Sequence, residues 1–274
     1  MTRRAGNARA DGRRLDLGAA LRAGLTTMPR MYGEAWGALA FCVVAGVLPV
    51  LAPLPGAAAG VAVLFQGLAV LIAWSALTRI SLTRDLGGAQ ALGLGPAGLQ
   101  LGAGEGRIVA ALLLNLIFLA ILATVTTLLL LGVAGASDLD AEAIAARDWA
   151  AAGTPLQLAV VGAVALIALG VPLLFAVRLS LFAHASLGRG QVVSLNTLGV
   201  AEGSFWPLLL LLIVVALPRI ALAALSAQGV LTGAAGQIAG VLVLVLVQVP
   251  FAAGAMGEAY RRLEYWTPGM ERST

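Results

Sequence analysis

The chain has 274 residues, of which 60% are hydrophobic and only 11% are charged, and its mean hydropathy is +0.97. Soluble domains carry about 45–50% apolar and about 25% charged residues, so this composition excludes an ordinary soluble protein and indicates one that lies in a bilayer. The net charge of +4 comes from 17 arginines, with no lysine, against 13 acids. These charges flank apolar segments, which favours membrane topology over nucleic-acid binding as their explanation.

Six apolar segments are each long enough to cross a hydrocarbon core of about 30 Å, which takes about 20 helical residues. They are predicted at residues 34–53, 57–79, 107–133, 156–178, 205–224 and 235–258. Barrel strands alternate in polarity, whereas these runs are continuously apolar, and a single segment in lipid must satisfy its own backbone. The sequence therefore predicts an all-α, polytopic six-helix transmembrane bundle.

The arginines predict the orientation of this bundle. Fifteen of the 17 fall in the N-terminal arm, the loops after the second and fourth segments, and the C-terminal tail. The positive-inside rule puts these parts in the cytoplasm, so we expect six spans with both termini cytoplasmic. The expected divisions are an Arg-rich arm with an interfacial helix at 1–30, a membrane domain at 31–266 and a cytoplasmic tail at 267–274.

The arm at the N-terminus predicts contact with anionic lipid. Its second half is amphipathic, which is typical of a helix in the headgroup layer, and its arginines exceed its acids. The arginines expected to contact lipid are Arg13, Arg14, Arg22 and Arg30. A second interfacial helix is predicted over 182–198, while the glycines of 86–104 argue against a continuous helix there.

A short motif occurs twice in the cytoplasmic loops. Arg-Ile-Ser-Leu at 79–82 precedes Leu-Gly-Ala-Gly-Glu-Gly at 101–106, and Arg-Leu-Ser-Leu at 178–181 precedes Leu-Gly-Val-Ala-Glu-Gly at 198–203. Such a repeat indicates a duplicated unit, here a loop that joins two spans. With a fainter third copy, the pattern predicts three helical hairpins. Each hairpin would begin near a glutamate and end on an arginine, in the pairs Glu34 with Arg79, Glu105 with Arg178, and Glu202 with Arg261.

Two interpretations of these six charges are open. An acid near a helix N-terminus and a base near a C-terminus both complement the helix dipole, by about 0.3–1 kcal/mol each. Alternatively, the glutamates and arginines form ion pairs between neighbouring helices, as a ring on the cytoplasmic side. In that case we expect at least two close pairs, with Glu105–Arg79 or Glu202–Arg178 foremost.

Polar residues inside the spans have two interpretations as well. Gln66, Asn115 and Gln248 either form hydrogen bonds between helices, at about 0.6 kcal/mol each, or line a cavity. No Asp, Glu, Lys, Arg or His is predicted in the middle of a span, where such residues would indicate an ion path.

Residues for catalysis are scarce. His184 is the only histidine, and it is interpreted as an interfacial polar residue. No nucleophile elbow, phosphate loop or metal-ligand cluster is found, so we expect no enzyme activity and no cofactor.

One stretch of the chain resembles a known family. Val-Arg-Leu-Ser at 177–180, Gly-Arg-Gly at 188–190, Ser-Leu-Asn-Thr-Leu at 194–198 and Glu-Gly-Ser-Phe-Trp at 202–206 resemble the central loop of YciC-like bacterial inner-membrane proteins and of the membrane domain of some glycerophosphodiester phosphodiesterases. Ala-Tyr-Arg-Arg-Leu at 259–263 is similar to the end of their last helix. The resemblance implies a membrane architecture and a location in a bacterial inner membrane, and it carries no catalytic residues.

Two classes of function follow from these features. The first is a non-catalytic scaffold or accessory protein whose partners are anionic membrane lipids or another membrane protein. The second is a transporter of a small solute or lipid. A polar cavity that reaches Gln66, Asn115 and Gln248 would favour transport, and a closely packed interior would favour the scaffold.

Overall fold

The computed structural model describes residues 14–52, 55–137 and 139–264, and every regular element within these ranges is helical. In chain order the elements are α2 (Leu17–Glu34), α3 (Trp36–Leu51), α4 (Ala57–Leu82), α5 (Leu86–Ala91), η1 (Pro96–Gly98), α6 (Ala103–Gly135), α7 (Ala141–Ala145), α8 (Trp149–Ala152), α9 (Pro155–Leu179), α10 (Phe182–Arg189), α11 (Thr197–Val200), α12 (Phe205–Ala227), α13 (Gly233–Val243), η2 (Leu244–Gln248) and α14 (Val249–Leu263). Five helices or helix runs are long and apolar enough to cross a membrane, and the count reaches six if the bent pair α2–α3 forms one span.

Five of the six predicted segments coincide with these helices to within five residues at each end. The first segment differs, because its expected start falls in α2 and the remaining helix, α3, has only 16 residues. The two helices meet at Ala35 with a bend of 89°. If α3 crosses a membrane, α2 therefore runs along the surface of that membrane. The helix also continues to Glu34, four residues past the expected end of the N-terminal arm.

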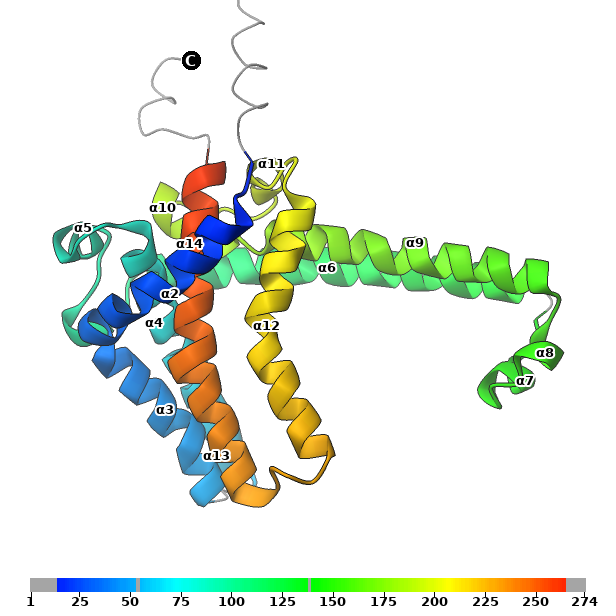
Figure 1. Ribbon diagram of the computed structural model, residues 1–274, viewed down its shortest axis with the longest axis horizontal. Coiled ribbons are helices and arrows are strands. Elements are labelled where there is room, and N and C mark those ends of the chain that lie inside the picture. Colours follow the sequence, from blue (N-terminus) through cyan, green and yellow to red (C-terminus); the bar gives the residue numbers. More distant parts are fainter. Residues whose placement is uncertain (1–13, 53–54, 138, 265–274) are drawn as a thin grey trace, which may run out of the picture.

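The long helices do not form one closed bundle. In Figure 1, α3, α4, α12 and the run from α13 to α14 descend side by side, whereas α6 and α9 leave together in another direction, with α7 and α8 at their tip. Buried residues of α6 occur only between Glu105 and Asn115, so the rest of this 33-residue helix has α9 as its main neighbour. The expected six-helix bundle of three hairpins is therefore not confirmed, because α6 and α9 form an arm apart from the group of α3, α4, α12 and α13–α14.

Small residues allow close helix packing at one end of this group of helices. We call this end the junction and define it as α2, α10, α14 and the last three turns of α4. A Cβ on Gly24 of α2 would lie 2.7 Å from the ring of Phe251, and one on Gly254 of α14 would lie 3.0 Å from the Cα of Gly24. A Cβ on Gly257 would come within 2.4 Å of the Ser81 hydroxyl on α4. Glycine is required at these crossings because the backbones approach so closely.

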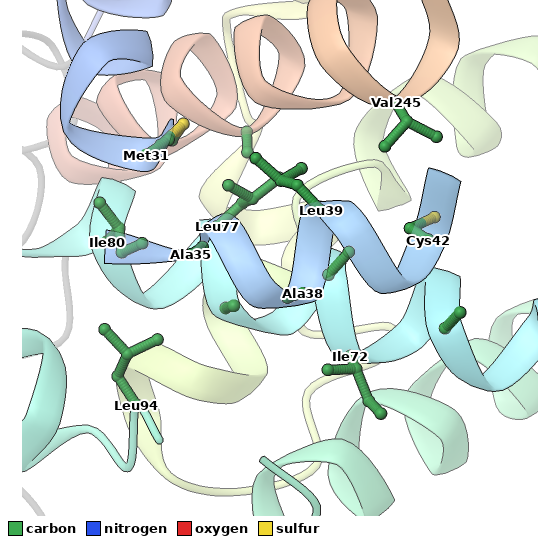
Figure 2. Close-up of a cluster of buried hydrophobic side chains, with 14 of the residues drawn as sticks. Met31, Ala35, Ala38, Leu39, Cys42, Ile72, Leu77, Ile80, Leu94 and Val245 are labelled. Atoms are coloured by element: carbon green, nitrogen blue, oxygen red, sulfur yellow. The ribbon is translucent and has the colours of Figure 1, made fainter. Parts of the chain in front are cut away.

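A buried apolar cluster connects the bent pair to α4 (Figure 2). Met31 of α2 and Leu39 of α3 lie beside Leu77 of α4, and Val245 of η2 closes one end. Most other members are alanines, which let the helices pack tightly. This cluster fixes the bend at Ala35, because residues on both sides of the bend contribute to it.

The C-terminal run of helix contains a π turn, η2, between α13 and α14. Pro250, the second residue of α14, has no N–H to offer the Leu246 carbonyl four residues earlier. The Tyr32 hydroxyl of α2 donates a hydrogen bond to that carbonyl instead. The π turn is therefore held by a residue of the junction.

The interfacial segments differ from expectation. The Asp16 carboxylate caps α2 by accepting from the Ala19 N–H at 3.0 Å, and this bond lowers the pKa of Asp16. However, α2 buries Ala20, Gly24 and Met31 against its neighbours and is not free in the headgroup layer. The segment 182–198, predicted as a second interfacial helix, is not one helix: α10 ends at Arg189, α11 begins at Thr197, and the five residues from Ala183 to Leu187 are buried in the junction. The glycine-rich 86–104 segment does break into two short helices, as predicted.

Candidate functional site

The first copy of the duplicated motif forms an ion pair. Arg79 lies in the last turn of α4 and Glu105 in the first turn of α6. Arg79 Nη1 donates to Glu105 Oε1 at 2.6 Å, and both side chains are at most 4% exposed. The pair joins two consecutive long helices across the loop between them. Removal of either partner would leave a buried charge without a counter-charge.

Neighbouring groups form further hydrogen bonds with this pair. Ser75, one turn before Arg79, donates to Glu105 Oε1 at 2.7 Å and accepts from Arg79 Nη1 at 3.0 Å. Arg79 Nε donates to the Leu92 carbonyl, and Gln100 Nε2 donates to Ser75 at 2.9 Å. Glu105 also accepts from the Gly102 N–H that precedes its helix, at 2.9 Å. The arrangement is a closed polar network beside a cavity of about 180 Å³, and it holds the loop in one conformation.

The second copy of the motif forms no such pair. Arg178 ends α9 and Glu202 lies in the turn before α12, but no ion pair or hydrogen bond joins their side chains. Glu202 is exposed, and Arg178 Nε is buried without a hydrogen-bond partner among residues 14–52, 55–137 and 139–264. The helix starts explain the difference in part: α6 begins two residues before its glutamate, whereas α12 begins three residues after.

The expected ring of six charges does not form. Glu34 pairs with Arg30 in its own helix at 2.7 Å, and Arg261 pairs with Glu258 one turn earlier at 2.7 Å. Arg261 also donates to the Ser81 carbonyl of α4. Of the pairs expected among the six residues, the described part of the chain contains only Arg79–Glu105. The third copy of the repeat is thus not supported, because its charges are already satisfied within α2 and α14.

Three arginines surround a cavity of about 400 Å³ at the junction, which we call the arginine pocket. It is lined by residues of α2, of the end of α4 with the loop after it, and of α14, namely Thr26, Thr27, Arg30, Ser81, Thr83, Arg84, Glu258 and Arg261. Arg30 donates to Glu34 and to Thr83, whereas the exposed Arg84 has no hydrogen-bond or ion-pair partner among the described residues. Three guanidinium groups against one carboxylate make the lining positive.

The other arginines expected to contact lipid lie near this pocket in sequence. Arg14 and Arg22 are exposed, and Arg22 donates to the Gly18 carbonyl of its own helix. Arg13 lies outside the described residues. The same holds for the tail at 267–274.

A second, larger cavity of about 540 Å³ lies between α3, α4, α12 and α13, at the end of the spans opposite the junction. Gln66 and Gln248, both expected to line a cavity, do line this one. Asn115 does not, because it is buried near the base of α6, where its Oδ1 accepts from the Ser194 hydroxyl at 2.6 Å. The cavity thus reaches two of the three predicted residues. Its polar lining is completed by Arg219, Ser226 and Gln237, which sequence reasoning did not assign to a site.

Arg219 is the main residue that the sequence analysis missed. It is the fifteenth of the 23 residues of α12 and follows Pro218. It was counted among the charges on the side opposite the cytoplasm, although the predicted segment 205–224 contains it. A signal was present, because α12 continues to Ala227 and so carries an arginine well inside an apolar helix, where a charge indicates function.

His184 is fully buried, with an exposure of 0%. Its Nε2 lies 3.2 Å from the Ala253 carbonyl of α14, and its ring packs edge-on against Trp74. Within the described residues, no three His, Cys, Asp or Glu side chains gather as metal ligands would.

Comparisons with protein-family models, with curated proteins and with solved structures found no match.

Proposed function

We propose that this protein is a non-catalytic integral protein of a bacterial inner membrane, of scaffold or accessory type, that contacts anionic lipid or a membrane partner at its cytoplasmic face. The observation that carries the proposal is the arginine pocket between α2, α4 and α14. The resemblance to YciC-like proteins agrees with a membrane role and remains a prediction.

The position of the pocket supports contact with lipid. The 89° bend lets α2 lie along a membrane surface when α3 crosses it, and the pocket opens where α2 meets the ends of α4 and α14. A charge near an anionic surface contributes about 1 kcal/mol per arginine. Arg84 is the arginine of this pocket whose donors are not used within the described chain, so it is available to a phosphate headgroup.

Lipid selectivity tests this proposal. The full chain is reconstituted in phosphatidylcholine vesicles, and its immobilisation of spin-labelled phosphatidylglycerol is compared with that of spin-labelled phosphatidylcholine. We expect a preference for phosphatidylglycerol that weakens with salt and in Arg84→Gln. Arg147→Gln, in the loop between α7 and α8, is the matched control and should leave the preference unchanged. Equal immobilisation of the two spin-labelled lipids by the unmodified chain would contradict the proposal.

The proposed orientation has a separate test. Both termini are cytoplasmic in the proposal, and the loop between α6 and α9 is on the other side. Reporter fusions at Ser137 and Thr274 should therefore report opposite sides of the membrane. The same side for both would refute the topology without bearing on lipid binding.

A second candidate function is transport of a small solute or lipid, which the cavity lined by Gln66 and Gln248 favours. Cys42 is the only cysteine, so a Cys42→Ala chain with Ser226→Cys carries a single label site in the cavity. An impermeant maleimide should label this cysteine from one side only in a scaffold. Labelling from either side would favour alternating access, and therefore transport.

A further inference from the structure

The cavity between α3, α4, α12 and α13 combines one cation, three amides and the Ser226 hydroxyl in a lining that is apolar elsewhere. The four residues, Arg219, Gln66, Gln237 and Gln248, come from the four elements α12, α4, α13 and η2, and no acid lines the cavity. Within the described part of the chain, Arg219 has neither an ion-pair partner nor a hydrogen-bond partner. Its donors are therefore not satisfied by the protein.

Arg219 lies well away from both ends of α12. Eight residues separate it from the end of α12 at Ala227, which is about 12 Å of helix. A charged side chain within an apolar helix is costly in lipid and usually faces a polar cavity or a partner. Here it lines the cavity while remaining exposed, and the chain supplies no counter-charge.

A second unsatisfied group lines the same cavity. Gln248 Oε1 is buried and has no hydrogen-bond partner among the described residues. It belongs to the π turn, a distortion that often occurs at functional sites. A guanidinium without an anion and a buried amide oxygen without a donor together match a ligand that carries an oxyanion beside a hydroxyl.

We propose that this cavity binds the head of an anionic glycerol phosphate, with the phosphate on Arg219 and a hydroxyl on Gln248. The cavity volume of about 540 Å³ is within the range of about 300–1,000 Å³ for small-molecule sites. The apolar part of the lining accommodates the start of an acyl chain, so the same chemistry is offered by a phospholipid from the bilayer or by free glycerol phosphate. The proposal does not rest on the arginine pocket or on transport.

Gly240 provides a way to fill the cavity without changing its charge. It lines the cavity, and a Cβ built on it meets no atom within 4 Å. Gly240→Leu therefore places a side chain in the site. Gly67 of α4 likewise has open space around a Cβ, but it is exposed and does not line the cavity. Gly67→Leu is thus a matched control.

Native mass spectrometry of the full chain in neutral detergent tests the proposal. All variants are made in an Arg84→Gln background, which weakens the arginine pocket. The probes are phosphatidylglycerol, glycerol phosphate and, as a neutral-headgroup comparison, phosphatidylcholine. We expect one bound phosphatidylglycerol or glycerol phosphate per chain, in excess of phosphatidylcholine. Occupancy should fall about tenfold in Arg219→Gln, as expected for a lost charge-assisted bond, and also in Gly240→Leu, but not in Gly67→Leu.

The two anionic probes distinguish the source of the ligand. Binding of phosphatidylglycerol alone assigns the site to membrane lipid, and binding of glycerol phosphate assigns it to a solute. Both outcomes support the proposal if Arg219→Gln and Gly240→Leu reduce them while the thermal unfolding midpoint is kept. The proposal is overturned if neither anion exceeds phosphatidylcholine, or if binding persists in both variants.

Discussion

The two copies of the duplicated motif have nearly the same sequence and opposite structures. In the first, Arg79 and Glu105 form a buried ion pair at 2.6 Å, whereas in the second Glu202 is exposed and Arg178 Nε lacks a partner. Besides the different helix starts, three substitutions contribute to the contrast. Ser75, Gln100 and Gly104 of the first copy correspond to Leu174, Thr197 and Ala201 of the second.

Each of the three substitutions removes a requirement of the pair. Ser75 bridges both charges, and Leu174 cannot. Gln100 donates to Ser75, and no such serine exists in the second copy. A Cβ on Gly104 would lie 2.4 Å from Arg79 Nη2, so an alanine at this place requires the Arg79 guanidinium to shift. A buried ion pair needs the hydrogen bonds of its neighbours, because the attraction between the two charges alone does not offset the free energy of their desolvation.

The largest expected effect comes from removing one charge of the first copy. Glu105→Leu leaves Arg79 buried without a counter-charge and should lower the free energy of unfolding by about 3–5 kcal/mol. Glu202→Leu, in the second copy, should change it by less than about 0.5 kcal/mol, because its side chain is exposed. Unfolding by SDS in mixed micelles measures both. Equal losses would show that the copies do not differ in energy.

Gly104→Ala gives the first copy the alanine that the second copy has at Ala201. The new methyl group displaces the Arg79 guanidinium and should destabilise the protein by about 1–3 kcal/mol. Gly106→Ala, two residues on, meets open space and should be neutral or stabilise the helix by up to about 1 kcal/mol. A neutral Gly104→Ala would mean that the network tolerates a shifted arginine.

Ser75→Ala removes the bridge and keeps the ion pair. The loss of a hydrogen bond to a charged group predicts a decrease of about 1.5 kcal/mol in the free energy of unfolding. Ser180→Ala serves as control, because the Ser180 hydroxyl donates only to Val177 of its own helix. The same unfolding assay applies. If Ser75→Ala lowers the free energy of unfolding by less than Ser180→Ala does, the Ser75 bridge does not stabilise the ion pair.

The smallest effect is expected from Arg178→Met. The Nε atom of Arg178 is buried without a partner, so exchanging the charge for an apolar side chain of similar length should leave stability within about 0.5 kcal/mol or raise it. Arg79→Met should instead destabilise, as Glu105→Leu does. A loss of more than about 2 kcal/mol for Arg178→Met would point to a partner of Arg178 outside the described residues.

Much of the fold followed from the sequence. Continuous apolar runs gave five helix positions, since their lengths and composition determine them locally. The α6–α9 arm did not follow, because an apolar helix has the same sequence pattern whether lipid or another helix covers it. The bend at Ala35 was missed for a related reason: its cause is a cluster in which Met31 and Leu39 meet Leu77, and contacts so distant in sequence leave no local signal.

The candidate sites were predicted less completely. Gln66 and Gln248 were identified as polar residues in apolar helices, and both line the cavity. Asn115 has the same signal but meets Ser194, so polarity alone does not tell which residues converge. Arg219 was missed because it was counted among the charges on the side opposite the cytoplasm, although it lies within both the predicted segment 205–224 and α12.

The π turn between α13 and α14 has a consequence for how this helix tolerates changes in length. A π turn holds one more residue than an α turn, and each residue of an α-helix advances its faces by about 100°. On one side of it, Gly236 and Gly240 line the cavity; on the other, Gly254 and Gly257 pack against α2 and α4. The extra residue sets the angular phase between these two surfaces. Deleting a single residue there would leave both halves helical and turn one of them by about 100° about the helix axis. The number of residues in this stretch therefore sets the relative orientation of the two surfaces as well as the length of the helix.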